Sequence, residues 1–261
     1  MKRGLLLLIF AALPAWAQNV PLCSPEWAQW VEQKVQTGDG RGHGPDTGTD
    51  EWKSVVEFRL GIRGDAAVPA RETQAWCEHI DALVKQGPSF SCKGVQPGSM
   101  EAMICNDAGL AARDRQLAGV YQRALAKAGN EQPPMLRAEQ RGWIKGRNDC
   151  WKSEDQRACV RLQYELHTAE LQARYRLVPA RGPFRFACDG NPTNEVVVTF
   201  FDTQPSTLNA EYGDSVSLMY IQPSASGSRY EGRNESFWEH QGKATVRWGH
   251  DSPEMRCERV K

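Results

Sequence analysis

The sequence has little that would direct it to nucleic acid or hold it in a membrane. Its formal charge is zero, because 32 lysines and arginines balance 32 aspartates and glutamates. Nucleic acid and anionic membrane surfaces, the usual partners of strongly basic chains, are therefore not expected as main partners. Beyond residue 18, no apolar run approaches the roughly 20 residues that a membrane span requires. These absences favour a protein partner and predict no membrane span.

Motifs for catalysis are also absent. Ser226 lacks the Gly-x-Ser-x-Gly context of a nucleophile elbow, and the five histidines are scattered without an H-E-x-x-H or similar spacing. The cysteines lack the paired C-x-x-C form of many zinc sites. The sequence therefore predicts a protein that is not an enzyme and that needs no metal and no cofactor.

The first residues have the three parts of a secretory signal. The second and third residues are cationic, Leu5 to Leu13 form an apolar core, and Ala15-Trp16-Ala17 forms a cleavage site. We therefore expect residues 1–17 to be a signal peptide and the mature protein to be periplasmic. Cys23 follows Val20-Pro21-Leu22, whereas a lipoprotein signal places small residues before its cysteine. This difference favours a released protein over a lipid-anchored one.

Eight cysteines in an exported chain indicate disulfides. Two lie before residue 88, four between residues 89 and 180, and two beyond, so each segment can close on itself. Parity alone leaves the pairing of the middle four open. The pairing that we favour joins Cys23 to Cys77, Cys92 to Cys105, Cys150 to Cys159, and Cys188 to Cys257.

Hydrophobic spacing divides the exported chain into three parts and predicts a multidomain α+β protein. Residues 18–88 form a small helical region of unknown role, because their apolar residues recur at helical spacing. Residues 89–180 form a second helical domain. Residues 181–261 change to short alternating runs rich in Val, Tyr, Phe, Trp and Thr, which predict a small antiparallel β-barrel or sandwich of seven or eight strands. The expected strands are Phe184 to Cys188, Val196 to Phe201, Ser215 to Ile221, Arg229 to Gly232, Ser236 to Glu239, Thr245 to Trp248, and Met255 to Val260.

Two charged residues of the second helical domain fall on apolar helix faces. Asp114 has the spacing of Leu110 and Leu117, and Arg147 shares a face with Trp143. A buried charge without a partner is costly. We therefore predict a structural ion pair between Asp114 and Arg147.

The same domain resembles a known family of envelope proteins. Glu101-Ala-Met-Ile-Cys105, followed by Asp114 and Tyr121, precedes a Gln-x-x-Trp-x-x-x-Arg-x-x-Cys pattern from Gln140 to Cys150. Over about 75 residues this pattern resembles the LprI-like helical domain associated with lysozyme inhibition. The resemblance is specific for the family but carries little about function.

The C-terminal part carries a second resemblance. Phe186-Ala-Cys188-Asp-Gly190 opens it, and Ser224-Ala-Ser226-Gly227-Ser-Arg229-Tyr230 follows. Phe237-Trp238, with Ala244 six residues after the tryptophan, and the closing Cys257 complete the pattern. Together these residues resemble the MliC/PliC family of inhibitors of c-type lysozyme.

This resemblance implies an eight-stranded antiparallel barrel with two loops that enter the lysozyme cleft. In the family, a serine and a lysine reach the two catalytic carboxylates, and Ser226 takes the serine position. The usual Trp-x-Lys-Gly reads Trp238-Glu-His240-Gln241 here, and a lysine follows as Lys243. Either His240, whose side chain is a pH-dependent cation, or Lys243 then supplies the charge. The lysozyme-binding residues that we expect are Ser224, Ser226, Gly227, Arg229, Tyr230, His240 and Lys243.

Charge and motif together favour one function and leave a second open. From residue 182 to the end, eleven carboxylates face eight cations, which favours a cationic protein partner. The sequence therefore predicts a periplasmic inhibitor of c-type lysozyme. The alternative is a non-catalytic module that binds peptidoglycan or an envelope protein through its helical half.

Overall fold

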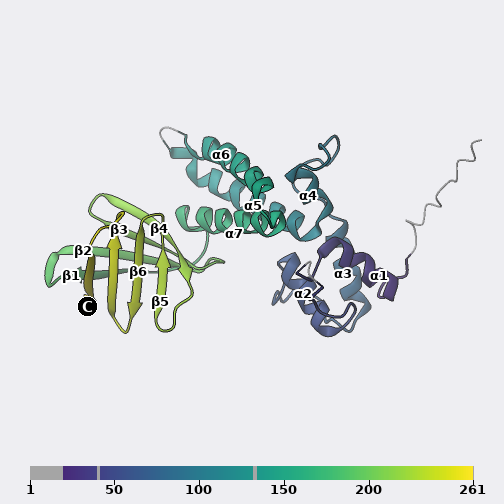
Figure 1. Cartoon of the computed structure of the whole chain (residues 1–261), viewed down its shortest axis with the longest axis horizontal. Helices are drawn as coiled ribbons and strands as arrows, with labels where there is room; N and C mark the ends of the chain where they lie inside the picture. Colours follow the sequence, from purple (N-terminus) through teal and green to yellow (C-terminus); the bar gives the residue numbers. More distant parts are fainter. Residues whose placement is uncertain (1–19, 40–41, 132–133, 261) are drawn as a thin grey trace, which may run out of the picture. The chain divides into compact units, whose positions relative to one another are not determined.

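The computed structural model describes residues 20–39, 42–131 and 134–260 (Figure 1). The chain divides into two compact units, one ending at Lys85 and the other beginning at Gln86. Within the described ranges, seven α-helices are followed by a closed antiparallel barrel of eight strands, which confirms the predicted fold class. No helix in these ranges is both long and apolar enough to cross a membrane. The predicted signal peptide lies outside the described residues.

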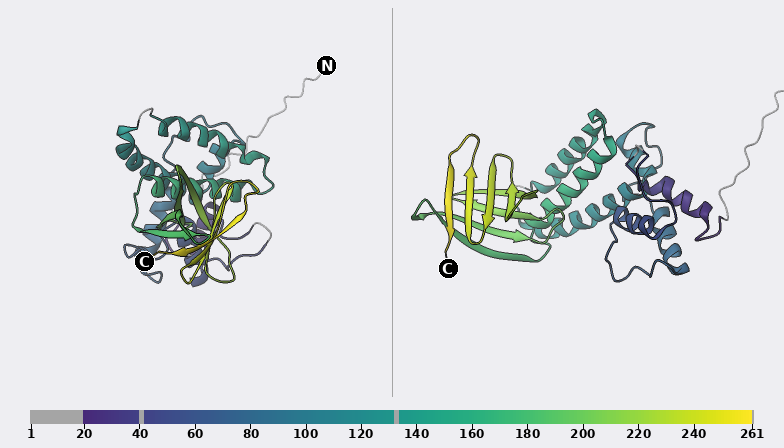
Figure 2. Two further views of the ribbon diagram at one scale, coloured as in Figure 1. Left: turned by 90° about the vertical axis from the view of Figure 1, so that its left-hand side faces the viewer. Right: turned by 60° about the horizontal axis from the view of Figure 1, so that its bottom comes forward.

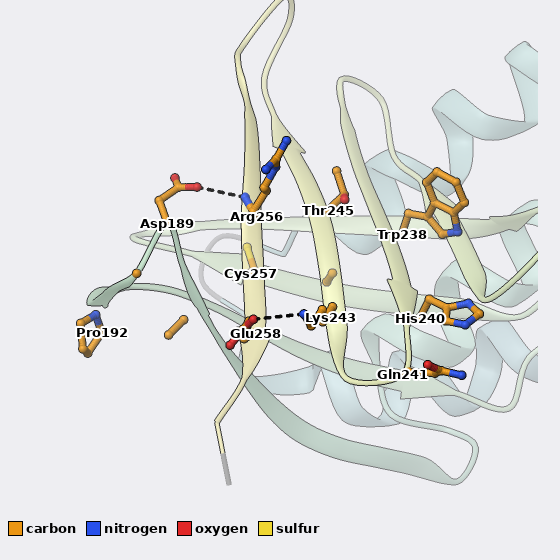
Figure 3. A pocket seen from close by; sticks show the side chains of 13 residues that line it. Asp189, Pro192, Trp238, His240, Gln241, Lys243, Thr245, Arg256, Cys257 and Glu258 are labelled. Carbon is orange, nitrogen blue, oxygen red and sulfur yellow. Dashed lines mark hydrogen bonds and ion pairs between the residues drawn. The ribbon is translucent and has the colours of Figure 1, made fainter.

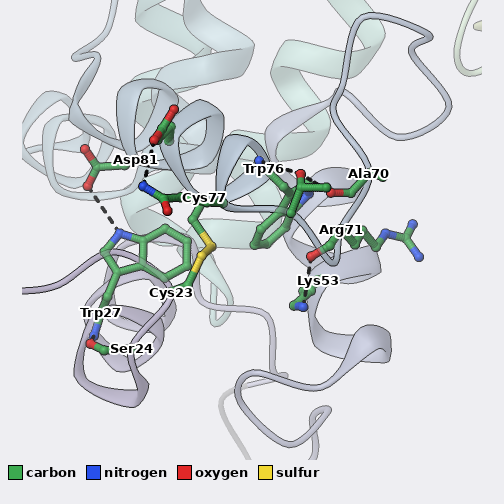
Figure 4. Close-up of a disulfide and its surroundings, with 12 residues drawn as sticks. Cys23, Ser24, Trp27, Lys53, Ala70, Arg71, Trp76, Cys77 and Asp81 are labelled. Atoms are coloured by element: carbon green, nitrogen blue, oxygen red, sulfur yellow. Dashed lines mark hydrogen bonds between the residues drawn. A yellow bond between two sulfur atoms is a disulfide. The ribbon is translucent and has the colours of Figure 1, made fainter.

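The first unit consists of three helices around a tryptophan core. They are α1 (Pro25–Val35), α2 (Asp50–Leu60) and α3 (Gln74–Lys85). Each helix contributes one buried tryptophan, and Trp76 of α3 makes edge contacts with Trp27 of α1 and Trp52 of α2 at centroid distances of 6.2 and 6.4 Å. The disulfide between Cys23 and Cys77 ties the start of α1 to α3, as predicted (Figure 4).

Each of these indole N–H groups donates to a carboxylate, as buried indoles require. The pairs are Trp27 with Asp81, Trp52 with Glu32, and Trp76 with Glu57. Glu57 also receives two hydrogen bonds from Arg71, at 2.7 and 3.0 Å. Burial alone would raise the pKa of Glu57, but the hydrogen bonds from Arg71 and Trp76 and the charge of Arg71 outweigh it and lower the pKa below its ordinary value. The ionised carboxylate therefore stabilises the folded unit.

The helical part of the second unit packs around one apolar core. Its elements are α4 (Met100–Asn106), α5 (Ala108–Lys127), η1 (Ala128–Asn130), α6 (Leu136–Asn148), η2 (Asp149–Lys152) and α7 (Gln156–Arg174). Leu110 and Leu117 of α5 and Tyr164 of α7 lie in this core. The disulfides Cys92–Cys105 and Cys150–Cys159 have the predicted pairing.

The predicted ion pair between Asp114 and Arg147 is wrong in its detail. Both residues are buried, but the hydroxyl of Tyr164 lies between them: it donates to Asp114 at 2.8 Å and accepts from Arg147 at 2.9 Å. Arg147 forms its ion pair with Glu101, at 2.8 Å. Asp114 also accepts the backbone N–H of Ser89 at 2.6 Å. Helical spacing placed both charges on the core side, but it could not show that a tyrosine on α7 would separate them.

The C-terminal part is a closed barrel in which each strand pairs with the next and β1 pairs with β8 (Figure 2). The strands are β1 (Ala180–Cys188), β2 (Asn191–Phe201), β3 (Thr207–Tyr212), β4 (Ser215–Gln222), β5 (Ser228–Glu231), β6 (Glu235–His240), β7 (Lys243–Trp248) and β8 (Glu254–Arg259). Seven correspond to the expected runs. The strand missing from the prediction is β3, whose sequence Thr-Leu-Asn-Ala-Glu-Tyr has few of the residues typical of strands.

Side chains alternate between the barrel core and the outer wall. Phe186, Tyr230 and Phe237 point into the core, which is filled by apolar side chains from all eight strands. Cys188 lies opposite Cys257 in the register of β1 and β8, and the two form a disulfide. The barrel is thus closed by hydrogen bonds and by this covalent link between its first and last strands.

Candidate functional site

Two neighbouring segments of the barrel bring the predicted site residues together. The first is the β4–β5 loop, residues 223–227, and the second is the hairpin of β6 and β7. The hairpin turns through Gln241 and Gly242, which both have positive φ, at 52° and 81°. Two-residue hairpin turns with both residues in this region suit the twist of antiparallel strands. The hairpin is therefore short and well defined.

The β4–β5 loop is fixed to the hairpin through the carbonyl of Ser226. This oxygen accepts the indole N–H of Trp238 at 2.9 Å and the hydroxyl of Ser224 at 2.6 Å. No described residue hydrogen-bonds the Ser226 hydroxyl, and the residue is exposed. The backbone of Ser226 thus holds the loop in place while its side chain stays available to a partner.

Gly227 lets the loop approach the hairpin closely. Its φ is +67°, and a Cβ built there would lie 2.2 Å from the carbonyl oxygen of Glu239 and 3.1 Å from the Cβ of His240. Contacts below 3.0 Å essentially do not occur for real Cβ atoms. Only glycine therefore fits at this position without displacing the loop or the strand.

The two candidate cations lie next to each other. His240 and Lys243 are directly opposite in the β6–β7 register, so their side chains share one face of the hairpin, the outer wall. Lys243 Nζ lies 3.6 Å from Glu258 Oε1, and both side chains are more than three-quarters exposed. Such an exposed pair contributes little energy and is easily exchanged for another partner. Among the described residues, none forms a hydrogen bond or ion pair with His240.

An open hollow of about 1130 Å³ lies on the outer wall beside these residues (Figure 3). Asp189 accepts the backbone N–H of Arg256 at one side, and Lys243 and Glu258 approach each other across β7 and β8. Residues that line the hollow include Asp189, Trp238, His240, Lys243, Arg256 and Glu258. The hollow offers charges of both signs around an exposed indole, which suits the surface of a protein better than a small apolar ligand.

The remaining predicted site residues divide between the wall and the core. Arg229 lies opposite Trp238 in the register of β5 and β6, on the outer wall, where it forms an ion pair with Glu231. Tyr230 is only 5% exposed, and its ring packs 5.6 Å from that of Phe200. Tyr230 therefore belongs to the barrel core, and its place among the lysozyme-binding residues stays a prediction. Its position in the motif reflects the alternation of β5, which turns every second side chain inward.

Sequence reasoning missed the contribution of strand β8 and of the β1–β2 turn to the hollow. Asp189, Arg256 and Glu258 join the hairpin only because β1 and β8 close the barrel. The alternation of β8 indicates which of its side chains point outward, but the sequence has no signal for the neighbours of a closing strand. Where the structure is described, it contains no group of three or more His, Cys, Asp or Glu residues that could hold a metal ion.

The fold and the site define a protein with internal disulfides, in which a helical domain is followed by an eight-stranded barrel. The barrel presents the β4–β5 loop and the β6–β7 hairpin. Both parts match known families. Residues 92–171 match the family "Lysozyme inhibitor LprI", and residues 186–255 match the family "Membrane-bound lysozyme-inhibitor of c-type lysozyme" (MliC). Both predicted resemblances are thus confirmed, in the predicted order.

Curated relatives support the same assignment. The chain is 29% identical over 198 residues to "Lipoprotein LprI" of Mycobacterium bovis and of Mycobacterium tuberculosis strain H37Rv. The matched residues make up 75% of this chain and 93% of each relative. No solved structure matches the chain significantly. The two families support a role in lysozyme inhibition and suggest a non-catalytic protein with lysozyme as its partner.

Proposed function

We propose that this protein is a periplasmic inhibitor of c-type lysozyme that blocks the glycosidase cleft with the β4–β5 loop and the β6–β7 hairpin. The observation that carries the proposal is the arrangement around Ser226. The carbonyl of this residue is bound to the hairpin, its hydroxyl is unoccupied among the described residues, and the loop packs against the strand that bears His240. Lys243 lies opposite His240 on the same face.

The chemistry of the target explains why such a surface would inhibit. Glycosidases of this class cleave with one protonated carboxylic acid and one carboxylate in the same cleft. A serine hydroxyl can hydrogen-bond to either group, and a cation can pair with the ionised one. Because His240 and Lys243 share a face, both can contribute positive charge, and Lys243 would exchange its exposed pair with Glu258 for a carboxylate of the enzyme. Nothing reacts, so the cleft is simply occupied.

The domain organisation follows from the same proposal. Residues 1–17 serve as a signal peptide, residues 18–88 as a helical region of its own, residues 89–180 as the LprI-like domain, and residues 181–261 as the inhibitory barrel. The curated relatives are named lipoproteins, but we propose that this protein is released. Cys23 is bonded to Cys77, and a thiol that forms a disulfide cannot carry a lipid.

Inhibition assays with the full-length protein test the proposal. We expect the wild type to inhibit c-type lysozyme more strongly than g-type or i-type enzymes. Ser226→Ala and the double change of His240 and Lys243 to alanine should each weaken inhibition at least about tenfold, a loss of about 1.4 kcal/mol of binding free energy. Arg247→Ala, an exposed change at the other end of β7, is the matched control and should inhibit like the wild type.

A second candidate function places the binding surface in the helical domain. The match of residues 92–171 to a lysozyme-inhibitor family favours it. If full inhibition survives all substitutions in the barrel, the cleft-blocking proposal is wrong and the helical domain becomes the inhibitor. If the wild type inhibits no lysozyme, both candidates fail, and a module that binds peptidoglycan or another envelope protein becomes the better interpretation.

A further inference from the structure

The indole of Trp238 has an unusual position for so large an apolar side chain. The residue lies opposite Arg229 and Thr245 on the outer wall and is 45% exposed, so it adds little to the barrel core. Its N–H nevertheless points to one acceptor, the carbonyl of Ser226, twelve residues earlier in the chain. In Figure 3 its ring stands beside His240 at the edge of the hollow. Packing alone therefore gives no reason for a tryptophan here.

Two contacts join the β4–β5 loop to the hairpin. The first is the hydrogen bond from the Trp238 indole, which is the only hydrogen bond between loop and hairpin among the described residues. The second is the close approach of Gly227 to the Glu239 carbonyl and the His240 Cβ, which is a steric contact. The hydroxyl of Ser224 donates to the same Ser226 carbonyl, but that bond lies within the loop.

From this geometry we infer that Trp238 is a positioning residue for the inhibitory loop. Its N–H holds the Ser226 carbonyl and so fixes where the Ser226 hydroxyl lies relative to the two cations. The inference rests on the proposed function, because the position of the hydroxyl matters only if a partner binds it. A loop that is already in its bound conformation loses less conformational entropy on binding, and affinity rises accordingly.

Trp238→Phe is the variant that isolates this role, because it keeps an aromatic ring and removes the N–H. One hydrogen bond contributes a net amount that corresponds to a loss of about three- to tenfold in affinity. Trp248→Phe is the matched control: Trp248 lies on β7, the other strand of the hairpin, and its ring packs 5.5 Å from that of Tyr212, away from the loop. The control should change inhibition by less than about twofold.

A double-mutant cycle on inhibition of c-type lysozyme separates positioning from direct contact. If Trp238 acts through Ser226, Trp238→Phe should weaken inhibition in the wild type but have little further effect in Ser226→Ala. If the losses of inhibition from the two substitutions multiply in the double variant, the indole contacts the enzyme independently of Ser226, and the inference is overturned. An unchanged inhibition constant for Trp238→Phe would overturn it as well.

A measurement without lysozyme keeps this inference distinguishable from the proposed function. Trp151 is 61% exposed, and no described residue accepts its indole N–H. In nuclear magnetic resonance spectra of the full chain, the Trp238 indole proton should exchange with solvent about tenfold more slowly than that of Trp151, because it is hydrogen-bonded. Equal rates would overturn the inference whatever lysozyme does. If exchange is slow but the wild type does not inhibit, the proposed function is rejected, and the positioning role with it. The hydrogen bond between the Trp238 indole and the Ser226 carbonyl would still stand.

Discussion

Replacing Gly227 with alanine should weaken inhibition of c-type lysozyme while the barrel stays folded. The new Cβ would lie 2.2 Å from the Glu239 carbonyl oxygen, whereas real Cβ contacts essentially never fall below 3.0 Å. Loop and strand must therefore separate by about 0.8 Å, the difference between these two distances. The strand is held on both sides by β5 and β7, so the exposed loop is the part that will move.

Two costs add up at this position. The left-handed backbone of Gly227 costs a residue with a Cβ roughly 1–2 kcal/mol, and crowding of a packed contact typically costs about 1–3 kcal/mol. The loop can avoid both by leaving its place, but it then loses the hydrogen bond between Ser226 and Trp238. We expect inhibition of c-type lysozyme to weaken at least about tenfold, while the barrel stays folded.

Gly213 provides the control for the backbone cost alone. It lies in the β3–β4 turn with a φ of +56°, and a Cβ there would meet no atom within 4 Å. Gly213→Ala should lower the melting temperature through the backbone cost alone and leave inhibition unchanged. Inhibition constants and thermal melts of both variants should be measured in the same buffer. Equal inhibition by the two variants would refute the reasoning about the loop.

Two further predictions concern the helical parts. Glu57→Gln should make the first unit less sensitive to acid. Because the folded pKa of Glu57 is lowered, its stabilisation is present above the unfolded pKa of about 4.3 and is lost as pH falls through the folded pKa. In urea titrations, the wild type should therefore lose more stability than the variant between pH 6 and pH 2. Tyr164→Phe should cost about 1–3 kcal/mol of unfolding free energy, because Asp114 and Arg147 lose their shared partner. Tyr121→Phe serves as its control, and equal costs would contradict the bridging role.

Much of the fold could be predicted because most elements had an independent local signal. The even number of cysteines in each segment limited the pairing, and Cys188 with Cys257 was the simple choice for a barrel that must join its ends. Period-two alternation of Val, Phe and Tyr identified seven strands. β3 lacked that signal, because Asn209, Ala210 and Glu211 are held in a strand by pairing with β2 and β4 rather than by their own preference.

The site was predictable in composition but not in geometry. The motif predicted Ser226, His240 and Lys243 as site residues, and left open which of the two cations would supply the charge. The register adds that the two residues flank one turn and share one face. The motif also could not show that the side chain of Tyr230 points into the barrel core. Asp114 and Arg147 were placed correctly on the core side, but the residue between them came from another helix.

The central claim is that the barrel occupies the catalytic cleft. Competition tests it most directly: c-type lysozyme is saturated with an N-acetylglucosamine oligomer that fills the cleft, and binding of the full-length protein is measured by calorimetry. The account predicts that the apparent affinity falls in proportion to the oligomer concentration, and that Ser226→Ala binds more weakly in its absence. Undiminished binding, with a complex that contains enzyme, oligomer and protein together, would contradict the account.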